Sequence, residues 1–369
     1  FPTRRSSDLF IRQIQKMASD VEFQSKHIRD GEKDFKRTRK LTFSDVIMYT
    51  IGNTRSPLEL EAQRFSKYLT ADEISGAALC KARQKIKYTA FEELFEQTAA
   101  SAPKDKRFHG YHLYAVDGMK GELPKTPELS AKYCETEKCK TPVFHAVSTF
   151  DILNEMFIRS KFHFGTADER ELAGKMIDAV AQDVYYKDEP QIWIFDRGFP
   201  SLSLIQKLLE HRLYFVMRVS SSFLKEVNAF RKSKYVDRMI HIEYSGRRAT
   251  QNHVHSDGIS QFDLRCVRVK LPSGEDEILV TNLDRKDFPK RDIKEIYRLR
   301  WGIETGFNYL KNAVFVEEFV SKTENGLAQD YFVSLLVYNF ATCICGSMYP
   351  NIPKKENTST RSIEELPPD

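Results

Sequence analysis

The sequence has few cysteines, and their spacing matches neither a disulfide framework nor a zinc site. The six cysteines stand at positions 80, 134, 139, 266, 343 and 345. Cys134 and Cys139 lie near each other in the chain, but no second pair of ligands accompanies them. This usage favours a reduced cytoplasmic compartment over an oxidising one.

The sequence also lacks a signal peptide and an uninterrupted apolar run long enough to cross a membrane. Its longest apolar stretch, residues 331–349, is interrupted by Ser334, Asn339 and Thr342. Such a stretch is typical of a buried helix rather than a transmembrane one. We therefore expect no membrane partner.

The excess of positive charge is small, with a net charge of +5 and a pI near 8.7. The charge is unevenly distributed, because residues 24–40 carry seven Lys or Arg against three acids. Residues 231–255 and 285–300 are similarly basic. Basic clusters of this kind indicate nucleic-acid binding when they lie on one surface.

The first part of the chain is predicted to be helical. Residues 1–9 resemble the translation of a sequencing-library adapter, so we expect them to be non-native and leave them out of the fold prediction. Residues 10–108 repeat apolar side chains at helical spacing, and Lys81, Arg83 and Lys85 flank one predicted helix. We expect an all-α N-terminal DNA-binding domain that contacts the DNA backbone, with a packing or dimerisation domain as the alternative.

From residue 109 the pattern changes to α/β. Two apolar runs end on an aspartate, at Asp117-Gly118 and at Asp196-Arg-Gly, and both are typical of buried strands closed by a turn. An acid at the carboxyl end of a strand lies where ligands bind in α/β sheets. The predicted order is β-β-β-α-β-α-β, a mixed five-stranded sheet whose first three strands are antiparallel. These strands are expected at residues 111–117, 143–150, 155–160, 193–196 and 213–219.

A single amphipathic helix is predicted over residues 297–311. At about 100° per residue, Tyr297, Arg300, Glu304 and Lys311 project within an arc of roughly 60°. A charged helix face of this kind is most often only solvated. The two aspartates at strand ends allow a second interpretation of this helix face. In it the carboxylates of Asp117, Asp196 and Glu304 meet at one edge of the sheet.

Residues 220–283 are predicted to be a β-rich insertion between the fifth strand and this helix. A hairpin is expected from strands at 262–271 and 277–283 around a Pro-Ser-Gly turn. The tail at 350–369 is polar and without periodicity, so we expect it to be disordered.

With Asp117 and Asp196 on strands and Glu304 on a helix, the chain resembles a DDE transposase of the RNase H-like superfamily. The spacing Tyr297-x2-Arg300-x3-Glu304-x6-Lys311 matches the Y-R-E-K signature of its insertion-sequence-4 branch. The resemblance implies an RNase H-like α/β catalytic domain at residues 109–349 that contains the β-rich insertion.

The resemblance also implies a mechanism. Asp117, Asp196 and Glu304 would be the catalytic acids and would hold two Mg²⁺ ions, for which Mn²⁺ substitutes, with Asp117 shared between the ions. Arg300 and Lys311 would bind DNA phosphates, and Tyr297 would either donate a hydrogen bond to a phosphate or stack on a displaced base. The implied reaction is cut-and-paste transposition of an insertion sequence, by hydrolysis and strand transfer at the transposon ends.

The implied partners are double-stranded DNA, at the terminal inverted repeats and at the target, and a second copy in a homodimeric synaptic complex. The implied location is the bacterial cytoplasm, at the nucleoid when the protein is bound to DNA.

Two alternatives stay open at this point. In the family, helical sequence normally continues after residues 331–345, where this chain has a polar tail. A truncated, transposition-incompetent DNA-binding derivative that acts as an inhibitor is therefore one alternative. An RNase H-like nuclease without strand transfer is the other. The intact acids favour the transposase.

Overall fold

The computed structural model describes residues 2–348 except 37–39, 54, 70–72, 135–140, 245–260, 271–273 and 315. Cys139, the Pro-Ser turn of the predicted hairpin and the predicted tail at 350–369 lie outside the described residues. No helix within the described ranges is long and apolar enough to cross a membrane.

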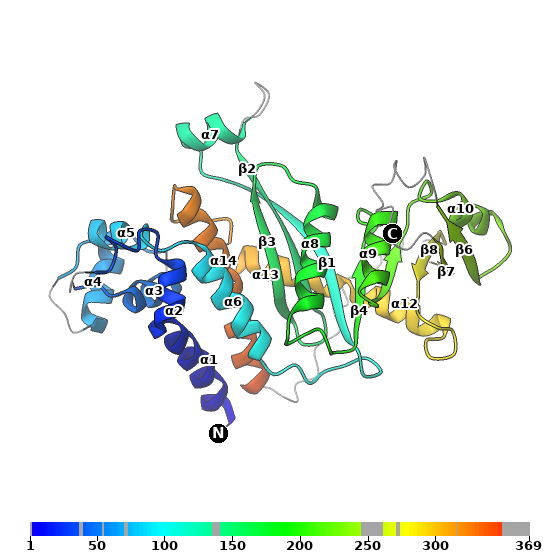
Figure 1. Cartoon of the computed structure of the whole chain (residues 1–369), viewed down its shortest axis with the longest axis horizontal. Helices are drawn as coiled ribbons and strands as arrows, with labels where there is room; N and C mark the ends of the chain where they lie inside the picture. The colour runs from blue at the N-terminus through cyan, green and yellow to red at the C-terminus, as the bar shows by residue number, and fades with distance from the viewer. Residues whose placement is uncertain are drawn as a thin grey trace, which may run out of the picture.

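A mixed eight-stranded sheet forms the centre of the protein, with strand order β3-β2-β1-β4-β5-β8-β7-β6 (Figure 1). β1, β4 and β5 run parallel to one another, and all other neighbouring pairs are antiparallel. The strands are β1 (His112–Glu122), β2 (Val143–Asp151), β3 (Met156–Phe164), β4 (Gln191–Phe195), β5 (Tyr214–Arg218), β6 (Asp237–Glu243), β7 (Gln261–Lys270) and β8 (Asp276–Thr281).

The prediction of a five-stranded sheet is wrong in the number of strands, because the sheet has eight. All five predicted strands are present as β1–β5, and the first three are antiparallel as expected. However, β5 is not an edge strand, because Val216, Met217 and Arg218 pair with β8. The strands that follow β5 in the chain thereby extend the same sheet. Helix α10 and strand β6, both within residues 220–260, were not predicted from the pattern.

Helices cover both faces of this sheet. The described helices are α1 (Pro2–Ser19), α2 (Val21–His27), α3 (Phe43–Gly52), α4 (Leu58–Leu69), α5 (Gly76–Arg83), α6 (Thr89–Ser101), α7 (Pro127–Tyr133), α8 (Glu169–Gln182), α9 (Leu202–Glu210), α10 (Lys225–Lys232), α12 (Lys290–Leu299), α13 (Trp301–Asn312) and α14 (Glu324–Met348). Because side chains alternate along a strand, β1 contributes to two cores. Leu113 and Ala115 join the core with α6, α13 and α14, whereas Tyr114 and Val116 join the core with α8 and α9.

The N-terminal helices lie at one end of the molecule, and β6–β8 with α10 lie at the other (Figure 1). The N-terminal helices are joined to α14 by packing and by polar contacts. Buried apolar residues of α1, α3 and α6 belong to the same core as those of β1–β3 and α14. The guanidinium of Arg83 donates to Gln329 at 2.7 Å and forms an ion pair with Asp330 at 2.5 Å. The predicted division into two domains therefore falls across one continuous core, and it stays a prediction.

Candidate active site

Asp117 lies within β1 and not at its end. The strand continues to Glu122, because pairing with β2 extends to Glu122 opposite Val143. Pairing with β4 stops earlier, at Val116 opposite Phe195. The predicted strand end at Asp117 is therefore wrong for β1 but marks where its parallel neighbour ends. Asp117 is the first residue of β1 beyond the carboxyl end of β4.

Asp196 directly follows β4, as predicted. Val116 and Phe195 form the last pair between the parallel strands β1 and β4. Asp117 and Asp196 are the next residue of each strand, at the same end of the sheet. The two aspartates therefore lie side by side at one sheet edge, the placement that the strand pattern predicts for ligand-binding acids.

Gly118 is not the turn glycine that the pattern predicted, because it lies within β1. A Cβ at this position would come within 2.5 Å of Oε1 of Glu169, at the start of α8. The absence of a side chain thus allows the Glu169 carboxylate to lie against the backbone beside Asp117. The sequence held no signal for this fourth acid.

The predicted single helix over residues 297–311 is two helices, α12 and α13, which meet at Arg300. At the junction the N–H of Arg300 donates to the Tyr297 carbonyl at 3.1 Å, and the N–H of Ile303 donates to the Arg300 carbonyl at 3.1 Å. Bonds between residues three apart tighten the turn relative to an α-helix. After the junction α13 packs on the sheet, where a Cβ at Gly306 would come within 3.1 Å of the Phe150 ring. Arg300 keeps helical backbone angles, φ −50° and ψ −35°, so the junction is a tightened turn rather than a change of direction.

Arg300 lies between two of the predicted catalytic acids. Its Nη2 is 2.7 Å from Oε1 of Glu304, and its Nη1 is 3.6 Å from Oδ2 of Asp117. The side chain is only 3% exposed. Its Nε and Nη1 have no hydrogen-bond partner in the part of the chain that the structure describes. The structure thus joins Asp117 and Glu304 through one buried cation.

Asp196 is held from two other elements. The hydroxyl of Tyr297, on α12, donates to its Oδ1 at 2.9 Å. Arg218, the last residue of β5, places Nη1 3.8 Å from the same oxygen. Burial acts to raise the pKa of Asp196, but hydrogen bonds from the Arg197 N–H and from Tyr297, together with Arg300 and Arg218, outweigh it and lower the pKa.

Arg218 was missed by the sequence analysis, although a signal was present. It ends a buried strand parallel to β1 and β4, so it reaches the same sheet edge as the two aspartates. Its other nitrogen, Nη2, is 2.7 Å from Oε1 of Glu277. A charged residue at the carboxyl end of a predicted parallel strand, whether acidic or basic, thus indicates a side chain of the site.

The three predicted acids are close enough to influence one another. The pKa of Asp117 is raised to about 6, first by burial and further by the negative charges of Glu304 and Asp196; the Gly118 N–H and Arg300 act in the opposite direction. Carboxylates gathered in this way are the donors that Mg²⁺ and similar hard cations prefer. Within the described ranges, however, no three His, Cys, Asp or Glu side chains lie close enough to hold one metal ion together. The donor chemistry thus fits a divalent cation, while Arg300 occupies the position between two of the donors.

Lys311 stands apart from this cluster. Its Nζ is 2.8 Å from Oε1 of Glu317, which lies near Gly121 at the far end of β1. Its ion pair within the described residues is thus with an acid other than the three predicted ones. The structure brings together Asp117, Asp196, Glu304, Tyr297 and Arg300, and it shows no contact of Lys311 with them.

Comparisons with known proteins identify the family. A family model described as "Transposase DDE domain" matches residues 96–340, well over half of the chain. Transposase InsG for insertion sequence element IS4 of Escherichia coli K12 is 21% identical over 321 residues, covering 82% of this chain and 70% of that protein. A putative transposase for insertion sequence element IS4SA of Synechocystis is 22% identical over 267 residues, covering 67% of this chain and 71% of its own length.

A solved structure shares the fold. The chain is similar to a piggyBac transposase in a cryo-EM structure of its synaptic complex with hairpin DNA, with a TM-score of 0.51 and 12% identity over 92% of this chain and 76% of that one. At this identity the similarity concerns the fold. The family model carries the assignment: the chain belongs to the transposases with a DDE domain, in the insertion-sequence-4 branch, and is a DNA transposase.

Proposed function

We propose that this transposase performs cut-and-paste transposition of an insertion sequence, with Asp117, Asp196 and Glu304 as its catalytic carboxylates. One observation carries the proposal. Asp117 and Asp196 directly follow the last paired residues of the parallel strands β1 and β4. Arg300 forms ion pairs with both Asp117 and Glu304. The proposal thus rests on two aspartates at one sheet edge and on a glutamate of α13 that Arg300 joins to the first of them.

The transposases of this family depend on divalent metal ions. In our proposal Asp117, Asp196 and Glu304 would hold two Mg²⁺ ions, for which Mn²⁺ would substitute. Bound ions of this kind activate an oxygen nucleophile and stabilise the charge on the phosphate. Arg300 competes with them for Asp117 and Glu304, because its guanidinium already neutralises both carboxylates.

The residues around the acids have separate roles in this proposal. Tyr297 orients Asp196 through its single donor hydrogen, and it binds a DNA phosphate in exchange for that bond. Arg300 has two nitrogens without a hydrogen-bond partner among the described residues, and a guanidinium suits the two-pronged binding of a phosphate. Lys311 binds DNA as a point charge, in exchange for its ion pair with Glu317.

We further propose that separate parts of the fold carry catalysis and DNA binding. Strands β1–β5 form a five-stranded RNase H-like core within residues 109–349, and residues 220–283 are an insertion that prolongs its sheet. The helices at residues 10–108 form the DNA-binding part. The similar piggyBac structure is a synaptic complex with DNA. By extension, this chain acts as a homodimer on the terminal inverted repeats and target DNA, at the bacterial nucleoid.

The two alternatives are not favoured. A DNA-binding inhibitor has no need of gathered acids, whereas here Arg300 joins Asp117 to Glu304 and Arg218 pairs with Asp196. A nuclease without strand transfer is also less well supported, because the family model that matches residues 96–340 is a transposase domain.

The test uses the purified chain with a linear duplex that carries the ends of its own insertion sequence. We expect Mg²⁺-dependent cleavage at the ends and, with pre-cleaved ends and a target plasmid, products joined to the target. Cleavage without joined products would support the nuclease instead. Binding of the ends with neither reaction would support the inhibitor.

A further inference from the structure

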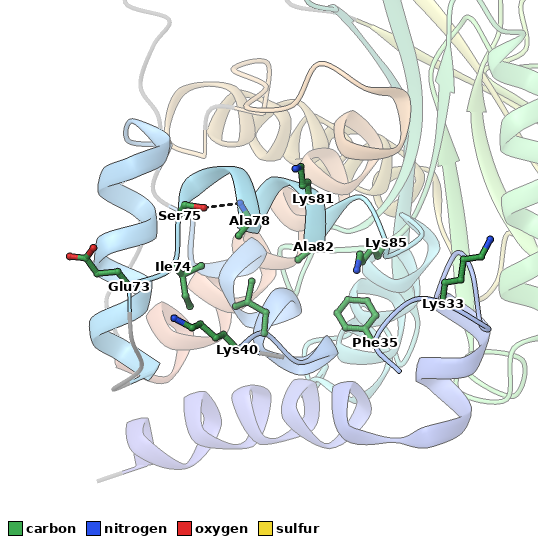
Figure 2. A pocket seen from close by; sticks show the side chains of 11 residues that line it. Lys33, Phe35, Lys40, Glu73, Ile74, Ser75, Ala78, Lys81, Ala82 and Lys85 are labelled. Carbon is green, nitrogen blue, oxygen red and sulfur yellow. Dashed lines mark hydrogen bonds between the residues drawn. The ribbon is translucent and has the colours of Figure 1, made fainter. Parts of the chain in front are cut away.

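A pocket of about 610 Å³ opens among the N-terminal helices, far from the acidic cluster in the sequence. One wall comes from Lys33, Phe35, Lys40 and Leu41, and the other from α5 and the residues just before and after it (Figure 2). These walls contain parts of the basic segment at 24–40 and of the basic helix flank that the sequence pattern singled out. The fold brings the two segments together around one cavity.

The charge around this pocket is strongly positive. Four lysines line it against a single acid, Glu73. Lys81 is exposed, and no ion pair is found for it within the described ranges. Lys33 is 3.4 Å from Asp30 with 82% of its side chain exposed, so this pair is weak. Lys85 also lies 3.5 Å from Asp34, so two of the four lysines already have an acid beside them. Lys81 is the lysine on which the argument for a negatively charged ligand rests.

The interior of the pocket is apolar. Figure 2 shows Phe35 and Lys85 across the cavity from Ile74 and Lys40, with Ala78 and Ala82 between them on α5. The Lys85 ammonium lies 5.6 Å from the centre of the Phe35 ring. A ligand that satisfies both features has a negative group for the rim and a flat, weakly polar body for the interior.

A nucleotide has this chemistry. We propose that the pocket takes up one unpaired nucleotide of a DNA strand, with its phosphates on the lysines and its base or sugar against Phe35 and Ile74. The volume lies within the range of about 300–1,000 Å³ of small-molecule sites, and bases stack readily on aromatic side chains. A concave site of this kind excludes the convex surface of an intact duplex. This inference rests on the proposed function, because it names where the enzyme holds DNA outside the acidic cluster.

The experiment measures binding of the full chain to two fluorescein-labelled probes in EDTA, which prevents cleavage. One is a blunt duplex of roughly 20 base pairs, and the other adds a single-stranded overhang of about five nucleotides. Fluorescence anisotropy is followed over a salt series for Lys81→Ala, for Ala78→Trp and for Lys67→Ala. Lys67, an exposed lysine of α4 outside the pocket, is the matched control.

We expect the wild type to bind the overhang probe more tightly than the blunt one. Lys81→Ala should weaken overhang binding by about tenfold and reduce the salt slope by about 0.7, the value for one contact to a single strand. Ala78→Trp keeps all the lysines but fills the cavity, so it should remove the preference for the overhang. If a melting curve shows that Ala78→Trp unfolds the protein, Ala78→Leu replaces it.

Equal binding of both probes by the wild type would overturn the inference. So would a Lys81→Ala effect no larger than that of Lys67→Ala, or an overhang preference that survives Ala78→Trp. None of these results touches the catalytic proposal, which is tested separately by Mg²⁺-dependent cleavage. Loss of cleavage in the acid variants with no effect in the pocket variants would leave only the pocket inference refuted.

Discussion

Tyr297 donates its hydroxyl hydrogen to Oδ1 of Asp196 at 2.9 Å and so ties α12 to the carboxyl end of β4. Burial, followed by the charge and hydrogen bond of Asp196, raises the pKa of Tyr297 well above its ordinary value, so the phenol stays protonated and remains a donor. A donor of this kind orients a carboxylate that holds a metal ion.

Tyr297→Phe should therefore weaken Mg²⁺ binding more than it lowers the free energy of unfolding. We expect the Mg²⁺ concentration for half-maximal cleavage to rise by about tenfold or more, the usual effect of removing a partner of a metal ligand. Tyr309→Phe, at an exposed tyrosine of α13, is the control. An unchanged Mg²⁺ requirement in Tyr297→Phe would separate this hydrogen bond from the metal site.

Asp117→Asn, Asp196→Asn and Glu304→Gln should each reduce cleavage by about a thousandfold or more, because each removes a carboxylate from the proposed metal site. DNA binding in EDTA should stay within about twofold, since none of the three is a cation that binds phosphate. Asp263→Asn, at an exposed acid of β7 that pairs with His241, provides the control. Appreciable cleavage by any of the three variants would remove that residue from the site.

Arg300→Met should leave Asp117 and Glu304 without the cation between them. We expect a loss of about 2 kcal/mol in the free energy of unfolding, less than for a fully buried pair because both carboxylates are partly exposed. Mg²⁺ should restore more stability to the variant than to the wild type, because no guanidinium competes with it. Urea unfolding with and without Mg²⁺ measures this difference, and equal Mg²⁺ stabilisation of both proteins would contradict the competition.

Arg83→Met should loosen the N-terminal helices from α14. Arg83 is buried, donates to Gln329 and to the Gly326 carbonyl, and pairs with Asp330, so its removal leaves a buried acid without its cation. We expect a cost of about 3 kcal/mol in urea unfolding. Arg64→Ala, at an arginine of α4 whose side chain is 54% exposed, should cost less than about 0.5 kcal/mol. Similar losses in both variants would show that the interface does not depend on Arg83.

Asp237 gives the protein a stability that depends on pH. Burial acts to raise the pKa of Asp237, but ion pairs with Arg265 and Arg285 outweigh it and lower the pKa from its ordinary 3.8. Because the folded pKa is depressed, the stabilisation is fully present above the unfolded pKa of about 3.9 and is lost as the pH falls through the folded value. Asp237→Asn should thus lower the free energy of unfolding at pH 7 but much less near pH 3. An equal deficit at both pH values would show that the pair is not responsible.

Much of the cluster of acids proposed as the active site was predictable because its signals are local. The alternation of apolar residues defines β1–β5, and Asp196 stands at a strand end that its own neighbours determine. The spacing of Tyr297, Arg300 and Glu304 predicted that these side chains belong together. Their pairing with the two aspartates follows from the parallel register of β1 and β4, which the α/β pattern anticipates.

The sequence by itself thus determined β1–β5, β7 and β8, and the placement of Asp117 and Asp196 at the same end of two neighbouring strands. Only the tertiary structure decided that β1 continues past Asp117, that β5 pairs with β8, and that the helix tightens at Arg300. It also decided that Arg300 turns into the acids and that two basic segments enclose one pocket. The reason is physical. Where a strand stops, which edge it pairs with and where a long side chain points depend on neighbours that are distant in the chain, and a local pattern carries no record of them.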